Sequence, residues 1–128
     1  MFLKLNDTFV KMNKVQYFSM IKNSSGNYDF YCQLINFDLI PIDIDFDYEN
    51  YLEYHHDILF YDDIYCGSNF VHLIDVYINF KNVSGIQIEK NKIVFYFNES
   101  FKFVYLDDLS EDDKLSLIDN VQIKLLGL

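Results

Sequence analysis

Residues 43–57 contain the side chains best suited to metal binding or catalysis, and they begin with three aspartates separated by single apolar residues. Asp43, Asp45 and Asp47 alternate with Ile44 and Phe46, and acids and tyrosines then continue to a pair of histidines. Carboxylates at this spacing match the first three ligand positions of an EF-hand calcium loop. The glycine of that loop and its glutamate at position twelve are both missing here, so calcium binding is not the preferred interpretation.

A β-strand explains the same alternation. Side chains two apart on a strand share a face. The face predicted to pack on a core carries Ile40, Ile42, Ile44 and Phe46. The three aspartates are then predicted to form an outward acidic ladder. Its neighbours lie about 6.6 Å apart, which is comparable with the spacing of phosphates along one nucleic-acid strand.

Three histidines and two cysteines are the other candidate metal ligands. The spacing of His55, His56, His72, Cys32 and Cys66 fits no standard zinc site. His55 falls on the apolar stripe of a predicted helix, which favours a half-buried structural histidine, and the other two histidines are predicted at the surface or on a sheet face. The start of the chain lacks a signal-peptide pattern, so the cysteines are expected to be reduced and the protein cytoplasmic. No cofactor is predicted.

The motifs of common enzyme classes are missing from the sequence. It contains no GxGxxG, GxxxxGK[ST], GxSxG, HExxH or CxxC. It also contains no arginine, and its net charge is −10, so direct binding to nucleic acid is not expected. No apolar run approaches the roughly 18 residues of a membrane span. A non-enzymatic protein outside the membrane is therefore predicted.

An internal repeat organises the chain. Residues 2–23 align without a gap on residues 70–91, and after removal of residues 24–27 the match continues with residues 36–43 on 100–107. The identical pairs are Phe2 and Phe70, Leu5 and Leu73, Asp7 and Asp75, Val15 and Val83, Lys22 and Lys90, and Asn23 and Asn91. We predict two tandem repeats, about 1–66 and 69–128.

Each repeat is predicted to form an antiparallel β-meander closed by one helix. Strands are predicted at 8–12, 15–21, 28–35 and 39–44 before a helix at 48–59, and at 76–80 and across 85–106 before the second helix. Pro41 predicts an edge strand. Ser110 and Gly127 are predicted to bound the second helix. Its predicted apolar stripe is Leu115, Ile118, Val121 and Leu125. The expected fold is α+β, with the repeats related by a pseudo-twofold and sharing one core in a single compact domain, 1–128.

Charge is unevenly distributed along the chain. No lysine occurs between Lys22 and Lys81, an interval that holds eleven acids. Tyrosines, which are frequent at protein interfaces, lie among these acids. The residues predicted to bind a partner are Asp43, Asp45, Asp47, Glu49, Tyr51, Glu53, Tyr54, Asp57, Tyr61, Asp62 and Asp63. The alternative is a solvated acidic surface that keeps a tyrosine-rich protein in solution.

These features favour a small acidic inhibitor that covers a basic surface on a nucleic-acid-processing enzyme or its effector complex. The abundance of Ile, Asn, Lys, Phe and Tyr is typical of an AT-rich genome, such as that of a low-GC bacterium or its phage. A phage-encoded inhibitor of host defence, of the anti-CRISPR type, would act in the host cytoplasm by nucleic-acid mimicry or steric occlusion. An immunity protein or antitoxin against a basic nuclease toxin is the first alternative.

Two further alternatives remain open. A metal-dependent hydrolase would use Asp43, Asp45, Glu49, His55 or His56. An assembly module would pair its exposed sheet edges into a homodimer.

Overall fold

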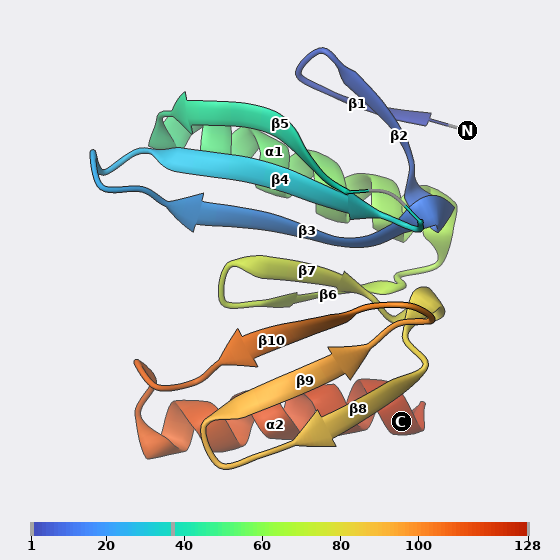
Figure 1. The fold of residues 1–128 in the computed structure, drawn as a ribbon, viewed down its shortest axis with the longest axis vertical. Helices are drawn as coiled ribbons and strands as arrows, with labels where there is room; N and C mark the ends of the chain where they lie inside the picture. The colour runs from blue at the N-terminus through green and yellow to red at the C-terminus, as the bar shows by residue number, and fades with distance from the viewer. Residues whose placement is uncertain (1, 37, 128) are drawn as a thin grey trace. The chain divides into compact units, whose positions relative to one another are not determined.

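The computed structural model describes residues 2–36 and 38–127, which form antiparallel sheets and two α-helices (Figure 1). The predicted α+β class with antiparallel sheets is confirmed. The chain divides into two compact units, Met1–Asn82 and Val83–Leu128. The first strands of the predicted second repeat therefore belong to the first unit. A single core shared by the whole chain stays a prediction.

The first unit is built on a five-stranded sheet. Its elements are β1 (Phe2–Leu5), β2 (Thr8–Lys11), the 3₁₀ helix η1 (Met12–Lys14), β3 (Val15–Lys22), β4 (Tyr28–Leu34), β5 (Leu39–Phe46), α1 (Tyr48–Tyr61), the π-helical turn η2 (Asp62–Cys66), β6 (Phe70–Leu73), β7 (Val76–Asn79) and the 3₁₀ helix η3 (Phe80–Asn82). The strand order is β5-β4-β3-β7-β6, and β1 and β2 form a separate hairpin. Pro41 lies in the edge strand β5, as predicted.

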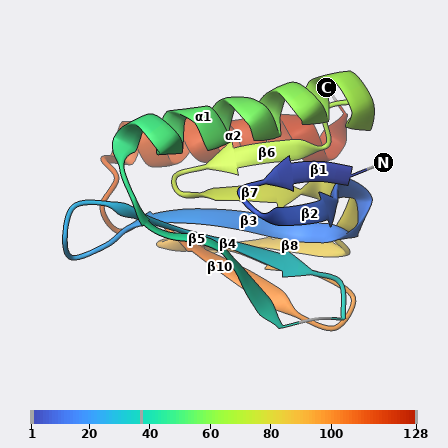
Figure 2. The same cartoon turned by 90° about the horizontal axis from the view of Figure 1, so that it is seen from above.

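Helix α1 covers one face of this sheet (Figures 1 and 2). Phe18 and Phe30 on the central strands are fully buried, and Tyr54 of α1 packs against Phe30 with ring centroids 5.0 Å apart. Ile58 of the helix and Tyr77 of β7 are also fully buried in the core of this unit. The core therefore lies between the helix and the sheet, and it fixes which side of α1 faces solvent.

The predicted alternation along β5 is wrong. In the pairing of β4 with β5, Tyr28 lies opposite Phe46, Phe30 opposite Asp43, and Tyr31 opposite Pro41. Strand β5 thus has one extra residue in each interval, which makes two bulges, and each bulge reverses the side-chain alternation. Ile44, predicted in the core, is half exposed as a result.

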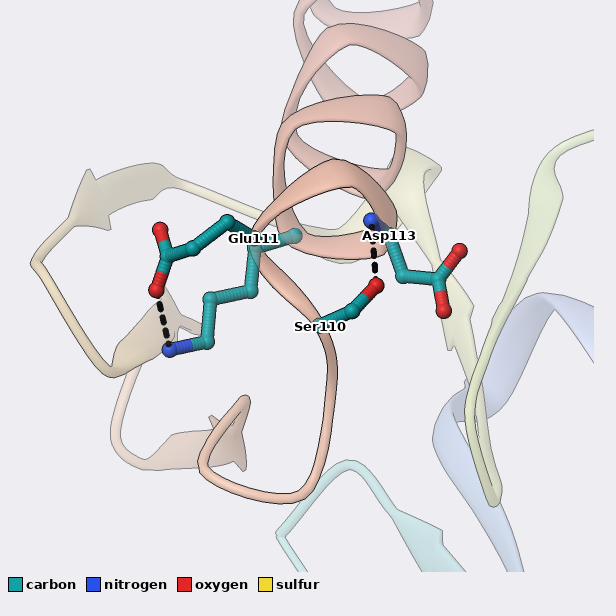
Figure 3. Close-up of polar contacts among 4 residues, drawn as sticks. Ser110, Glu111 and Asp113 are labelled. Atoms are coloured by element: carbon teal, nitrogen blue, oxygen red, sulfur yellow. Dashed lines mark hydrogen bonds and ion pairs between the residues drawn. The ribbon is translucent and has the colours of Figure 1, made fainter.

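The second unit is a three-stranded sheet with one helix. It contains β8 (Gly85–Ile88), β9 (Lys92–Tyr96), β10 (Phe101–Tyr105) and α2 (Glu111–Leu126), and its strand order is β10-β9-β8. The Ser110 hydroxyl accepts a hydrogen bond from the backbone N–H of Asp113 at 3.2 Å (Figure 3). Gly127 ends the helix with φ 72°. Both predicted ends of this helix are confirmed.

The predicted apolar stripe of α2 is only partly correct. Val121 is fully buried and Ile118 is half-buried, but Leu115 and Leu125 are exposed. A helix of this length spans about 24 Å, whereas strands of four or five residues span roughly 13–17 Å. The sheet is therefore too short to cover both ends of the helix. Among the described residues, no helix is long and apolar enough to cross a membrane.

The order of elements recurs along the chain. Two strands, a 3₁₀ helix, three strands and an α-helix follow one another twice. The hairpins that open each series have the same register, with Leu5 opposite Thr8 in one and Leu73 opposite Val76 in the other. Asn6 and Ile74 occupy the same turn position, and both have φ near 60°. This recurrence agrees with the sequence match, while the pseudo-twofold relation stays a prediction.

Candidate functional site

Asp43 does not point outward from the sheet. It lies opposite Phe30 in the antiparallel register, so the two side chains share the face that α1 covers. Its carboxylate accepts a hydrogen bond from the Tyr54 hydroxyl at 2.7 Å. Burial and this carboxylate both raise the pKa of Tyr54. Asp43 therefore links strand β5 to helix α1.

Asp45 binds the turn between β3 and β4. Its carboxylate accepts hydrogen bonds from the Ser25 hydroxyl at 2.8 Å and from the Asn23 amide at 3.0 Å. These bonds lower the pKa of Asp45, with Ser25 making the largest contribution. Asp45 itself has φ 58°, a left-handed conformation that belongs to the bulged part of the strand.

Asp47 caps helix α1. Its side chain accepts a hydrogen bond from the backbone N–H of Asn50 at 3.0 Å, which satisfies one of the free donors at a helix start. Asp43, Asp45 and Asp47 therefore have three different partners and do not share one face. The predicted acidic ladder on this strand is wrong, because the bulges of β5 break the alternation on which it depended.

Asp62 and Asp63 also differ in environment. Asp62 is buried, and its two carboxylate oxygens accept hydrogen bonds from the backbone N–H groups of Asn69 and Phe70, each at 2.9 Å. Asp63 is exposed and accepts a hydrogen bond from the Ser68 hydroxyl. Asp62 thus holds η2 to the start of β6, and only Asp63 lies on the accessible surface.

The predicted tyrosines pack mainly inside the first unit. Tyr51 stacks on Tyr28 with ring centroids 4.5 Å apart, and the Tyr54 ring meets Phe46 edge-on at 5.1 Å. Tyr61 is half-buried. The rings of Tyr51, Tyr54 and Tyr61 therefore contribute to the helix–sheet packing more than to an exposed face.

The solvent side of α1 and η2 combines acids with large apolar residues. We call this set the outer stripe: Glu49, Leu52, Glu53, His56, Phe60, Asp63 and Ile64, all exposed. From Glu49 to either Leu52 or Glu53, then to His56, to Phe60 and to either Asp63 or Ile64, each step is three or four residues, so the set lies on one side of the helix. Phe60 is 56% exposed and Ile64 55% exposed, which leaves much apolar surface in water. Asp57, expected to continue the acidic row, is half-buried beside this stripe.

The exposed apolar residues of the outer stripe were not predicted from the sequence. Leu52, Phe60 and Ile64 are not among the residues that the sequence predicts to bind a partner. The periodicity of α1 carried the necessary signal, because Glu49, Glu53, His56 and Phe60 recur at helical spacing.

A second cluster joins α1 to β6 and β7. His55 Nδ1 shares a hydrogen bond with the Tyr77 hydroxyl, and the His72 ring stacks on the Tyr77 ring with centroids 4.2 Å apart. Nε2 of His72 is buried without a hydrogen-bond partner among the described residues. Burial lowers the pKa of both histidines, and each is further lowered by a neighbouring imidazole, His56 for His55 and His55 for His72. The predicted half-buried structural role of His55 is confirmed.

Acidification is expected to destabilise the first unit through this cluster. Because the pKa values of His55 and His72 are lowered in the folded state, the unfolded chain binds more protons below pH 6.5. Stability is then full above about pH 6.5, the unfolded value, and falls as the pH drops towards the lowered values. The slope should correspond to the uptake of up to about two protons on unfolding.

Urea unfolding at pH 7.5, 6.5 and 5.5 measures this slope above the range in which carboxylates titrate. The double variant His55→Gln/His72→Gln should flatten it, and His56→Gln, at an exposed position, should retain most of it, because burial is the largest cause of the lowered His55 pKa. An unchanged slope in the double variant would assign the pH dependence to other groups.

No convergent metal-binding group is present in the described part of the chain. Within residues 2–36 and 38–127, no three histidine, cysteine, aspartate or glutamate side chains gather closely enough to hold a metal ion. Asp43 and Asp45 bind different partners, and His56 is exposed, whereas His55 and His72 are half-buried. The hydrolase alternative stays a hypothesis.

A hollow of about 360 Å³ lies beside η2 in the first unit. Its lining includes the side chains of Lys11, Lys81, Asn79, Tyr61 and Cys66. Burial raises the pKa of the Cys66 thiol, so the thiol stays protonated and is a weak nucleophile. Residues from β2, η2, β7 and η3 meet here only in the folded chain, so no local sequence pattern predicted this hollow.

Comparison with protein-family models, with curated proteins and with solved structures finds no match for this chain.

Proposed function

We propose that this chain is a non-enzymatic binding protein that places the outer stripe of α1 and η2 on a basic surface of another protein. The observation that carries this proposal is the combination of exposed acids with exposed Leu52, Phe60 and Ile64 along the outer side of α1 and η2. Large apolar side chains in a polar surround are typical of protein interfaces. A solvated face that only confers solubility needs no such residues.

Charge indicates the chemistry of the partner. Segment 23–80 contains no lysine, so the acids of the stripe repel a negatively charged partner and attract a positively charged one. Proteins that handle nucleic acids present grooves lined by Lys and Arg. Glu49 and Glu53 are four residues apart, which separates them by about 6 Å along the helix axis. This spacing replaces the predicted strand ladder as the basis for phosphate mimicry.

The biological role that fits best is inhibition of a nucleic-acid-processing enzyme. A phage-encoded inhibitor of host defence, of the anti-CRISPR type, would act in this way in a bacterial cytoplasm, by mimicry or by steric block. An immunity protein against a basic nuclease toxin would use the same face. A neighbouring toxin gene, or neighbouring phage genes, would distinguish the two roles.

Removal of two acids from the outer stripe is expected to weaken partner binding. Each exposed charge pair contributes about 0.2–1 kcal/mol, so Glu49→Gln/Glu53→Gln should raise the Kd about two- to thirtyfold. Phe60→Ala should raise it about fivefold or more if Phe60 lies at the centre of the interface. Proteins retained from a bacterial lysate at low and high salt are identified first, and the Kd of the purified partner is then measured.

A matched control removes the same charge elsewhere. Asp112 and Asp119 are exposed on α2, so Asp112→Asn/Asp119→Asn removes the same two negative charges and leaves the stripe intact. Duplex DNA should compete with the protein for a nucleic-acid-binding partner. Equal Kd values for the wild type and both double variants would contradict the proposal, and so would a partner whose binding is insensitive to salt and to Phe60→Ala.

A further inference from the structure

In the first unit, the hairpin β6–β7 pairs with the edge strand of the meander formed by β3, β4 and β5. We call this strand pairing the joint. Strand β7 of the hairpin β6–β7 pairs with β3, with Phe18 opposite Tyr77 and Ser19 opposite Val76. The backbone N–H of Met20 extends this ladder by donating to the Asp75 carbonyl at 2.9 Å. The joint therefore adds two strands to a three-stranded meander and completes the five-stranded sheet.

Two side-chain amides hold this hairpin in place. The Asn79 amide donates to the carbonyl of Val15 at 2.9 Å and to that of Met12 at 3.3 Å. The Asn82 amide donates to the carbonyls of Val15, at 2.9 Å, and Asn13, at 3.1 Å. Both donors satisfy backbone carbonyls just before and at the start of β3.

A second hairpin and a second meander edge occur in the chain, and they are not paired with each other. In the ungapped alignment of residues 2–23 on 70–91, the hairpin β1–β2 matches β6–β7, and β8 matches part of β3. Among the described residues, β2 pairs only with β1, and β8 pairs only with β9. A hairpin and a meander edge of the matching type are thus both left open.

Two residues that are buried at the β3–β7 pairing align with exposed residues on β2 and β8, as expected where no such pairing is made. Tyr77 is fully buried, whereas the matching Phe9 is 62% exposed. Met20 is 1% exposed, whereas the matching Ile88 is 37% exposed. Phe9 and Ile88 are therefore large apolar residues in water at positions that the first unit buries.

The hydrogen-bonding groups are also matched. Asn79 and Asn82 align with Lys11 and Lys14, which are again donors. The N–H of Glu89 donates to Lys92 across the β8–β9 hairpin. Because donors alternate between the two sides of an antiparallel strand, the N–H of Ile88 points away from β9. This is the group that matches the N–H of Met20.

We propose that the hairpin β1–β2 of one copy of this chain adds to the β8 edge of a second copy. The expected pairs are Val10 with Gly85, Phe9 with Ile86 and Thr8 with Gln87, and the Ile88 N–H donates to the Asp7 carbonyl. Lys11 and Lys14 donate to carbonyls around η3, as Asn79 and Asn82 do around η1. This inference is independent of the partner proposed for the outer stripe.

Such a contact joins unlike surfaces of two identical chains. The assembly is therefore head to tail, and it closes into a ring or continues as a filament. Strand addition over so few residues is a small interface, so we expect a Kd of about 10 µM to 1 mM. A second copy of this chain is the expected partner, because each copy carries both surfaces of the contact. The strand register, the apolar positions and the hydrogen-bond donors match those of the β3–β7 pairing that the chain makes within its first unit.

Sedimentation velocity from about 5 µM to 1 mM tests the proposal. The average mass of the wild type should rise with concentration. Phe9→Ser disables the hairpin, and Ile88→Pro removes the outward N–H without removing a bond to β9; each variant alone should remain monomeric. Phe101→Ser is the control, since Phe101 is 58% exposed on the opposite edge strand of the same sheet, and it should associate like the wild type.

An equimolar mixture of the two variants gives the most specific readout. The Ile88→Pro chain keeps a working hairpin and the Phe9→Ser chain keeps a working β8 edge, so the mixture should form dimers and nothing larger. Circular dichroism verifies that each variant is folded, and Ile88→Lys replaces Ile88→Pro if the proline variant unfolds. A monomeric wild type at 1 mM, association that survives either variant, or a mixture that stays monomeric would each overturn the proposal.

Discussion

Replacement of Phe18 by alanine is expected to lower the free energy of unfolding of the first unit by about 3–5 kcal/mol. Phe18 is fully buried on β3, the strand that pairs with both β4 and β7. Its ring meets Phe30 edge-on at 5.6 Å and stacks on Phe70 at 5.7 Å. The substitution therefore leaves a cavity and removes two aromatic contacts, and urea unfolding at pH 7.5 measures the loss.

Phe60→Ala is the matched control for this prediction. The same side chain is removed from an exposed position on α1, where alanine is a good helix former, so stability should change by no more than about 0.5 kcal/mol. Similar losses in the two variants would show that Phe18 does not lie in a packed core. Because Phe60 belongs to the outer stripe, this variant also separates partner binding from folding.

Replacement of Asp62 by alanine is expected to cost about 2–4 kcal/mol. Asp62 is 3% exposed, and its carboxylate accepts hydrogen bonds from the backbone N–H groups of Asn69 and Phe70. Alanine would leave both donors without this acceptor where η2 leads into β6. Asp62→Asn keeps one acceptor oxygen and should recover part of the loss. Equilibrium unfolding of the three proteins measures the order.

The neighbouring acid provides the control. Asp63→Ala removes one exposed hydrogen bond to Ser68 and should change stability by less than about 1 kcal/mol. Equal effects at the two positions would mean that burial does not distinguish them. If partner binding is measured in parallel, Asp62→Ala should act through folding and Asp63→Ala through the surface.

Most of the local structure could be predicted because it depends on neighbouring residues. Alternation of apolar residues located β3, β4, β9 and β10, and the helical period located α1 and α2. Ser110, Gly127 and Pro41 marked two helix ends and an edge strand through backbone chemistry that each residue brings with it.

The candidate site was predicted less well for a physical reason. The strand rule assigns a face to Asp43 and Asp45 only if the strand is regular, and two bulges in β5 break that regularity. The exposure of Glu49 and Glu53 on one side of α1 was predicted correctly, because a helix has no such freedom in its register. Burial of Asp62 depends on the return of the chain to β6, which no short window contains.

The sequence by itself determined the α+β class, the start of α1, both ends of α2 and the lysine-free acidic segment, because each follows from local patterning and composition. Only the tertiary structure decided that β7 pairs with β3, that the three aspartates around β5 have separate partners, and which side of α1 faces water. These outcomes depend on pairing between residues distant in sequence, where many partners have similar local propensity and packing selects one. The open hairpin β1–β2 and the open edge of β8 became visible only once that selection was known.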